Sequence, residues 1–446
     1  DAALALYDSD AASALLTVAA RHSPSPAALA SVRVRLAELA ESAGHYEDAE
    51  ALCDLALNWY EGDEDPLQAI RLKRMRTLVR MQRGQGARET LSALFALVDE
   101  ATLAGADTER ASILLVASQM LARLGEPYEA QRVAEECVAI AEHVGDPVLL
   151  CDSYNRLALC VVLSEPQRAR ELFRHALELI VPHSDVFRRV RLLNNIGFLE
   201  LTANRFQHAR ESLESAVRFA RTAKLIDLWA RASLNLGVIA CRSGQDEEAA
   251  RTLGEALRLS AEAQQTELQV ITTYNLGHLA RDQGDLQRAG EIYELAMELA
   301  DRIGQSDVKA GALAGKALCR LSLGHVEEAA SLNEQLQPLA RKLPEWFQGR
   351  ELVEAVPIHL ALRESKEKAY DLFTRALTLA ESGDVWGASW LVAEFSPILR
   401  EQAPEAIDAV VERYEAKPEL VDTPRIRERF GVTLRDSTKA VDRIRN

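Results

Sequence analysis

Aromatic residues are scarce in this chain of 446 residues, at 5% of the composition, although 48% of the residues are hydrophobic. No run of alternating Val, Ile or Thr is bounded by Asn-Gly or Asp-Gly, the turns that mark β-hairpins. Ala and Leu are abundant instead, and they recur at helical spacing. The sequence therefore predicts an all-α protein.

Long apolar runs are also missing, since the segment from Ile113 to Ala117 is typical of the longest, and no secretory leader is found. We expect a chain that does not span a membrane. Because it begins at Asp1 and opens directly in a helical pattern, we also expect it to be part of a longer polypeptide with attached domains.

Basic residues are in deficit, and the formal net charge is −16. Phosphate contacts require a surplus of Lys and Arg, so the body of the chain is not expected to bind nucleic acid. The segment from Arg425 to Asn446 differs, with seven basic residues against three acidic ones. The six cysteines include no Cys-x-x-Cys pair, which favours buried thiols in a reducing, cytoplasmic protein.

Catalytic and metal-binding motifs are not found. The closest approach to a phosphate loop, Gly311 to Lys316, has three residues between its glycines where four are needed, and Ala317 follows where a hydroxyl should hold magnesium. Small residues four apart on a helix indicate close helix packing instead. The nine histidines show no metal spacing, and the Gly-x-Ser-x-Gly motif is absent. We therefore predict no enzyme activity, no catalytic residue, no metal and no cofactor.

A repeat organises the sequence. In the stretch from Gln269 to Ala300, two amphipathic segments meet at a turn at Gly284, with Gly277 and Ala289 expected at their closest crossing. A small or polar residue, then Ala five positions on, then a small or apolar residue seven further on, recurs through the chain. The Ala returns with a strict period of 40 at Ala169, Ala209, Ala249, Ala289, Ala329 and Ala369. Such a period predicts a solenoid of about nine helical hairpins, each burying its apolar face against its neighbours.

The motif resembles that of the tetratricopeptide repeat (TPR). Its residues are Asn-Leu-Gly at 235–237 and 275–277, then Gly seven positions later and Ala five beyond that. The usual period is 34, and the longer period resembles the C-terminal sensor arms of bacterial signal-transducing ATPases of the STAND type. HEAT or armadillo repeats match the period better but do not predict this spacing.

The resemblance implies a right-handed α-solenoid with a degenerate C-terminal helical cap. Residues 1–22 are expected to hold the second helix of a truncated repeat, 27–385 the nine repeats, and 386–446 the cap with a basic exit segment.

In a TPR superhelix the first helix of each hairpin lines the concave groove, and the Asn two positions before the Gly points into it. This resemblance places a polar, locally basic strip in the groove. The strip residues are Arg191, Asn195, Arg231, Asn235, Asn275, His278 and Arg281. Amides can donate to and accept from a peptide backbone, so the strip suits an acidic peptide or a small anionic effector. Alternatively, the Asn amides serve neighbouring helices and the Arg side chains are merely solvated.

We expect a non-catalytic binding scaffold for a protein, peptide or effector, such as the sensor or partner-docking arm of a larger bacterial signalling or transcription regulator. The alternative is an assembly scaffold or an intramolecular clamp that docks another domain of its own chain.

Overall fold

The computed structural model describes residues 9–23, 25–42, 45–61, 65–82, 86–162, 164–343, 349–383 and 385–415. The predicted basic segment at 425–446 and the turn residues Gly44 and Gly84 lie outside them. The described residues form α-helices and one short 3₁₀-helix, without a strand, so the predicted all-α solenoid is confirmed. They fall into two compact units, residues 1–183 and 184–446.

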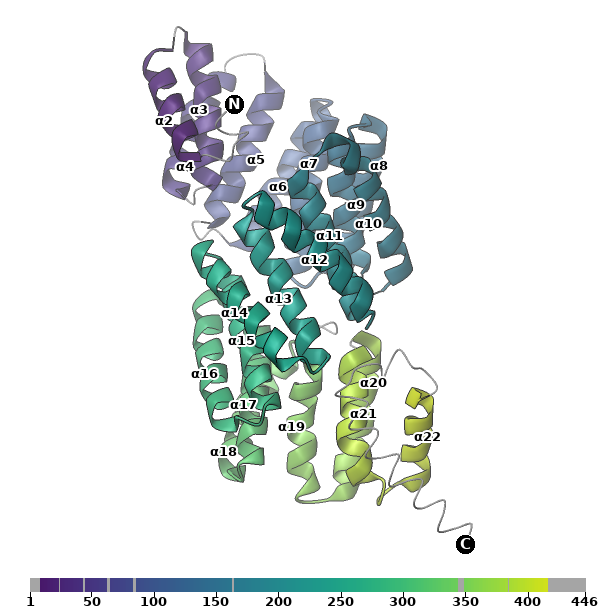
Figure 1. Ribbon diagram of the computed structural model, residues 1–446. Coiled ribbons are helices and arrows are strands. Elements are labelled where there is room, and N and C mark those ends of the chain that lie inside the picture. The colour runs from purple at the N-terminus through teal and green to yellow at the C-terminus, as the bar shows by residue number, and fades with distance from the viewer. Residues whose placement is uncertain are drawn as a thin grey trace. The chain divides into compact units, whose positions relative to one another are not determined.

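The first unit, drawn in purple to blue in Figure 1, contains four predicted hairpins preceded by one further helix. Its helices are α2 (Ser9–Arg21), α3 (Pro26–Ser42), α4 (Tyr46–Tyr60), α5 (Pro66–Gln82), α6 (Ala87–Leu103), α7 (Asp107–Arg123), α8 (Pro127–Val144), α9 (Pro147–Val161) and α10 (Pro166–Ile180), followed by the 3₁₀-helix η1 (Val181–His183). Pro127, Pro147 and Pro166 each begin a helix, where the missing N–H costs no hydrogen bond.

The second unit, teal to yellow in Figure 1, contains five predicted hairpins and one more. Its helices are α11 (Val186–Thr202), α12 (Phe206–Thr222), α13 (Ile226–Arg242), α14 (Asp246–Glu262), α15 (Thr266–Asp282), α16 (Leu286–Ile303), α17 (Ser306–Ser322), α18 (Val326–Ala340), α19 (Arg350–Leu362), α20 (Lys366–Gly383), α21 (Val385–Leu399) and α22 (Pro404–Glu415). Odd-numbered helices pack against their even-numbered partners and, from α11 to α17, also against the next odd-numbered helix.

The repeat period arises from two nearly equal halves, each made of one helix and one short connection. Between α11 and α17 the helices are of almost the same length, and so are the connections. Each connection contains one residue in the left-handed conformation. These residues are evenly spaced along the chain: Ser184, Asn204, Lys224, Gly244, Gln264, Gly284, Gly304 and Gly324. Left-handed residues end helices by turning the chain back, so each one starts the next antiparallel helix.

The hairpins of the second unit interlock through one glycine and one large residue. A Cβ atom on Gly277 would lie 2.7 Å from the ring of Tyr293, which is fully buried on the partner helix α16. Leu253 occupies the same place against Gly237 in the preceding hairpin. The predicted repeat alanines, including Ala289, have no exposed surface. Tight packing of this kind fixes the distance between helices.

Candidate functional site

The predicted strip lies on three successive odd-numbered helices of the second unit. Arg191 and Asn195 are on α11, Arg231 and Asn235 are on α13, and the other three residues are on α15. Neighbouring odd-numbered helices contact one another, so the strip residues belong to one row of helices. Their surroundings nevertheless differ from one end of the row to the other.

The α11 and α13 end is accessible. Arg231 is exposed, and Arg191 and Asn195 are half-buried. The guanidinium carbon of Arg191 lies 5.7 Å from the centre of the Phe187 ring, whose residue is 38% exposed. An aromatic ring beside a cation at a surface offers both apolar and charged contacts to a ligand.

The asparagine amides take part in the scaffold. Asn235 donates from Nδ2 to Oδ1 of Asn194 on the neighbouring helix α11, at 3.1 Å. Asn275 donates to the carbonyl oxygen of Ile271 on its own helix, at 2.8 Å. For Asn235 the structure thus shows a contact between neighbouring helices. Each amide retains further donor and acceptor capacity, and the role of these residues in ligand binding stays a prediction.

At the α15 end the side chains are held by their neighbours, although Asn275, His278 and Arg281 are half-buried, as Arg191 and Asn195 are. Nδ1 of His278 is 3.2 Å from the Tyr293 hydroxyl, and its ring meets that of Tyr274 edge-on at 4.2 Å between centres. Burial lowers the pKa of His278 to about 3, with the nearby Arg281 charge acting in the same direction. The imidazole is therefore neutral at physiological pH. His278 packs within the hairpin and does not present a charge to a ligand.

Arg281 is held by its neighbours. Its side chain is 12% exposed and forms an ion pair with Asp282 at 2.9 Å. Burial alone would lower the pKa of Arg281, but the Asp282 charge raises it above the usual value. Its guanidinium carbon also lies 5.9 Å from the centre of the Trp390 ring. Arg281 therefore faces α21 of the same chain.

A second arginine makes the same type of contact. The guanidinium carbon of Arg242, at the end of α13, lies 4.7 Å from the centre of the Trp386 ring. Arg242 and Trp390 are only 7% and 8% exposed. The α21 helix therefore covers Arg281, one of the three strip residues on α15, and Arg242 at the end of α13.

Sequence reasoning missed Arg242, Trp386 and Trp390, since the pattern beyond residue 385 indicates no more than a cap. Two signals pointed to them. The chain has only five tryptophans, and two of them stand four positions apart, which puts them on one face of a helix. Arg242 and Asp282 also occupy the same position of adjacent repeats, so two opposite charges stand next to each other along one row of helices.

The segment that resembles a phosphate loop is part of the packing. Gly311 and Gly315 lie in α17, where added Cβ atoms would overlap the Tyr274 hydroxyl and the Tyr293 ring. Both glycines leave room for tyrosines of α15 and α16. The prediction that this spacing reflects close helix packing is confirmed.

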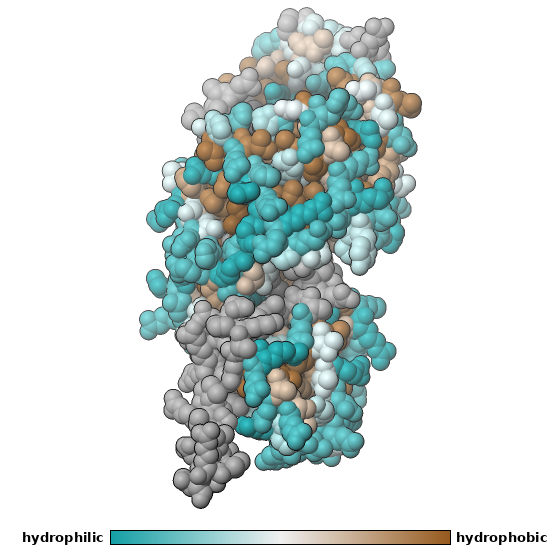
Figure 2. Space-filling model, turned by 90° about the vertical axis from the view of Figure 1, so that its right-hand side faces the viewer, coloured by the Kyte–Doolittle hydropathy of each residue, from teal (hydrophilic) through white to brown (hydrophobic). Residues whose placement is uncertain are grey.

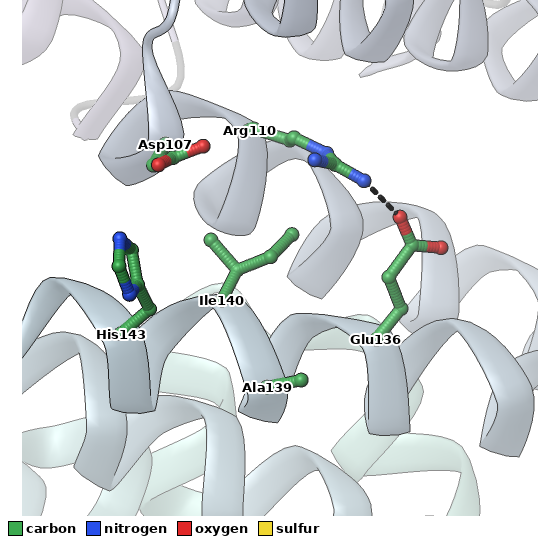
Figure 3. A pocket seen from close by; sticks show the side chains of 6 residues that line it. All are labelled: Asp107, Arg110, Glu136, Ala139, Ile140 and His143. Carbon is green, nitrogen blue, oxygen red and sulfur yellow. Dashed lines mark hydrogen bonds and ion pairs between the residues drawn. The ribbon is translucent and has the colours of Figure 1, made fainter.

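A surface hollow lies elsewhere, in the first unit between α7 and α8. It holds about 280 Å³. Figure 3 shows Arg110 and Glu136 joined by an ion pair on one side of Ile140, with Asp107 and His143 on the other side. The hollow is shallow and open to solvent. In the described part of the chain, no group of three or more His, Cys, Asp or Glu residues could hold a metal ion.

The surface seen in Figure 2 is mostly hydrophilic, with hydrophobic residues in patches between hydrophilic ones. No helix within the described ranges is both long and apolar enough to cross a membrane.

Repeated helical hairpins interlocked by small residues define the class of TPR-like repeat proteins. Within that class, residues 155–384, more than half of the chain, match the family model described as the MalT-like TPR region, and the chain belongs to this family. Residues 77–159 also match the model for anaphase-promoting complex subunit 5. No curated protein matches the chain.

Solved structures share the fold at low sequence identity. A Rap protein in complex with Competence and Sporulation Factor is 13% identical, with a TM-score of 0.60 over 90% of this chain and 99% of that one. The quorum sensor NprR from B. thuringiensis is 12% identical, with a TM-score of 0.54 over 76% of this chain and 99% of that one. A STAND protein with a TPR sensor from Pyrococcus horikoshii is 14% identical, with a TM-score of 0.49 over 81% of this chain, which spans 54% of that protein's length.

Proposed function

We propose that this chain is a non-catalytic scaffold that binds an acidic peptide or protein segment on the accessible part of the strip: Arg191, Asn195, Arg231 and Asn235. The observation that carries the proposal is the local charge. Residues 186–231 contain nine basic residues and four acidic ones, in a chain whose net charge is −16. A basic surface on an acidic protein attracts an acidic partner and repels a basic one.

The similar proteins support a sensing role. One of them was solved in complex with Competence and Sporulation Factor, and another is a quorum sensor. A repeat array in which each hairpin contacts only its neighbours changes its pitch when a ligand touches several hairpins. We therefore propose the sensor or partner-docking arm of a larger cytoplasmic regulator, with attached domains that respond to occupancy. A small anionic effector would use the same charges.

The test uses a fluorescently labelled peptide of alternating Glu and Gly, with binding followed by anisotropy. Arg231→Glu combined with Asn235→Ala should weaken binding at least tenfold, because a charge is reversed and an amide is removed from the same surface. Circular dichroism should show unchanged helix content.

The matched control is Arg251→Glu, which makes the same charge change at an exposed residue of α14, outside the basic segment 186–231. An equal loss of binding in this control would show that only the net charge matters, and would refute the strip.

A second function is favoured by the position of α21. This helix contacts Arg281 of the strip and also Arg242 at the end of α13. The array would then act as an intramolecular clamp whose ligand is a segment of its own chain. Limited proteolysis distinguishes the two functions, since a clamped segment should resist cleavage until an effector is added.

A further inference from the structure

The α21 helix has two opposite faces that differ in what they contact. At 100° per residue, Leu391, Phe395 and Leu399 lie on one face and Trp386 and Trp390 on the other. The first three have no exposed surface. Phe395 lies with its ring centre 4.8 Å from that of His359 on α19 and 6.2 Å from that of Phe373 on α20. This face of α21 is therefore part of a continuous apolar core.

The tryptophan face meets charged residues, although Trp390 also belongs to the apolar cluster that contains Leu391 and Phe395, and Trp386 packs against that cluster. Trp386 covers Arg242 of α13 and Trp390 covers Arg281 of α15, although α13 and α21 are four hairpins apart in sequence. Around Arg281 stand the Asp282 carboxylate and the buried Tyr274, whose hydroxyl makes no hydrogen bond to any described residue. This face of α21 is therefore an interface between guanidinium groups and indole rings.

The two faces of α21 differ in the free energy that exposing them to water would cost. Exposing the apolar face would place Leu391, Phe395 and Phe373 in water, which is unfavourable in proportion to the area. Exposing the tryptophan face would place two indole rings in water. It would also return two guanidinium groups and a tyrosine hydroxyl to water, and their regained hydration offsets part of the apolar cost. If the array opens, it should open between the tryptophans and the arginines.

We propose that Arg242 and Arg281 form a docking surface for the helix α21, and that their contacts with Trp386 and Trp390 act as a clasp that closes the array on itself. The clasp opens while α21 stays packed on α19 and α20. Opening uncovers Arg281, so it adds a charged residue of α15 to the accessible strip. This inference deepens the intramolecular clamp described above and rests on that function.

The test is hydrogen–deuterium exchange measured by mass spectrometry on the full chain. Two double variants each remove one half of the clasp. The tryptophan variant carries Trp386→Ala and Trp390→Ala on α21. The arginine variant carries Arg242→Gln and Arg281→Gln on α13 and α15. In both variants, amides in the last turns of α13 and α15 should exchange at least tenfold faster than in the unmodified protein. Amides of α19 and α20 should be unchanged.

Two outcomes would overturn the clasp. If exchange in α13 and α15 is unchanged in the arginine variant, the contact with the tryptophans does not protect these helices from opening. An equal increase throughout α19, α20 and α21 in both variants would mean that these side chains only stabilise the core. The arginine variant keeps the test decisive if the tryptophan variant does not fold.

The acidic peptide assay, run in parallel, separates this inference from the first proposed function. The clasp variants leave Arg191, Asn195, Arg231 and Asn235 in place, and these should still bind the peptide. Loss of the clasp effect with peptide binding retained would refute the clasp alone.

Discussion

Gly277 shows how a single residue sets the spacing of a hairpin. Its Cβ position is already filled by the Tyr293 ring, at 2.7 Å. We expect Gly277→Ala to lower the free energy of unfolding by roughly 1–3 kcal/mol, because Tyr293 must leave its packed position. Urea denaturation followed by circular dichroism measures the change.

Gly254→Ala is the control for that experiment. Gly254 lies inside α14, is exposed, and a Cβ there meets no atom within 4 Å. The substitution should raise stability by up to about 1 kcal/mol, because Ala is the better helix former. Equal effects of the two substitutions would show that the contact with Tyr293 is not what requires glycine at position 277.

His278 predicts a pH dependence. Its pKa is about 3 in the folded chain and about 6.5 when unfolded, so between these values the unfolded chain binds more protons. Stability should therefore fall as the pH decreases from 6.5 towards 3. From pH 7.5 to 5.5 the contribution of His278 is about 1 kcal/mol. The variant His278→Asn should lose less stability than the unmodified protein over this range, by about that amount.

Thermal denaturation at the two pH values provides the measurement. The other eight histidines are common to both proteins, and most carboxylates titrate below this range, so they cancel in the comparison. Identical pH dependence of the two proteins would mean that His278 is protonated as easily in the fold as in water.

Sequence and structure agree best where the chemistry is local to a repeat. The small residue at 277, the turn at Gly284 and the buried Ala289 all follow from a spacing that is visible in the sequence. The hydrogen-bonding role of the Asn235 and Asn275 amides does not follow from the sequence, because an amide can bond to a neighbouring helix or to a ligand equally well. Packing between two hairpins, which no spacing encodes, is what brings Asn235 to Asn194.

The connections between helices offer a test at the scale of the element. Gln264 and Gly284 occupy equivalent places in successive connections, with φ of 52° and 81°. The left-handed conformation costs a residue with a side chain about 1–2 kcal/mol, and glycine avoids this while losing more backbone entropy on folding. We expect Gln264→Gly to raise the free energy of unfolding by roughly 0.5–1 kcal/mol.

The reverse change, Gly284→Gln, should lower stability by about 1 kcal/mol. A side chain at Gly284 has open space around it, since a Cβ there would meet no atom within 4 Å. Only the backbone conformation is therefore being tested. Changes of the same sign in both variants, measured by thermal denaturation, would contradict this account of the turns.

The α21 helix shows which element could not be predicted. The repeat pattern weakens after Ala376, and a pattern of that kind reports only contacts between neighbouring hairpins. The contact of α21 with α13 joins Arg242 and Trp386, which are far apart in the sequence, so no local spacing encodes it. The composition of α21 does predict burial on more than one side, because the helix is apolar nearly all round.

At the scale of the whole molecule, stability should be divided between the two compact units, residues 1–183 and 184–446. Within each unit the buried hydrophobic residues form clusters that follow successive hairpins, for example around Leu94 in the first and around Leu213 in the second. In a repeat array the total stability approximates a sum of hairpin and nearest-neighbour terms. Each unit therefore contains most of the interactions that stabilise it.

We expect residues 1–183 and 184–446, expressed separately, each to show helical circular dichroism and a cooperative thermal transition. The fragment 184–446 should be the more stable, because it contains more hairpins and the large cluster that includes Phe373 and Phe395. The acidic peptide should bind this fragment, since it carries all the strip residues. A fragment 184–446 that is unfolded alone, but folds when residues 1–183 are added, would show that the chain is a single cooperative array and that its binding surface depends on both units.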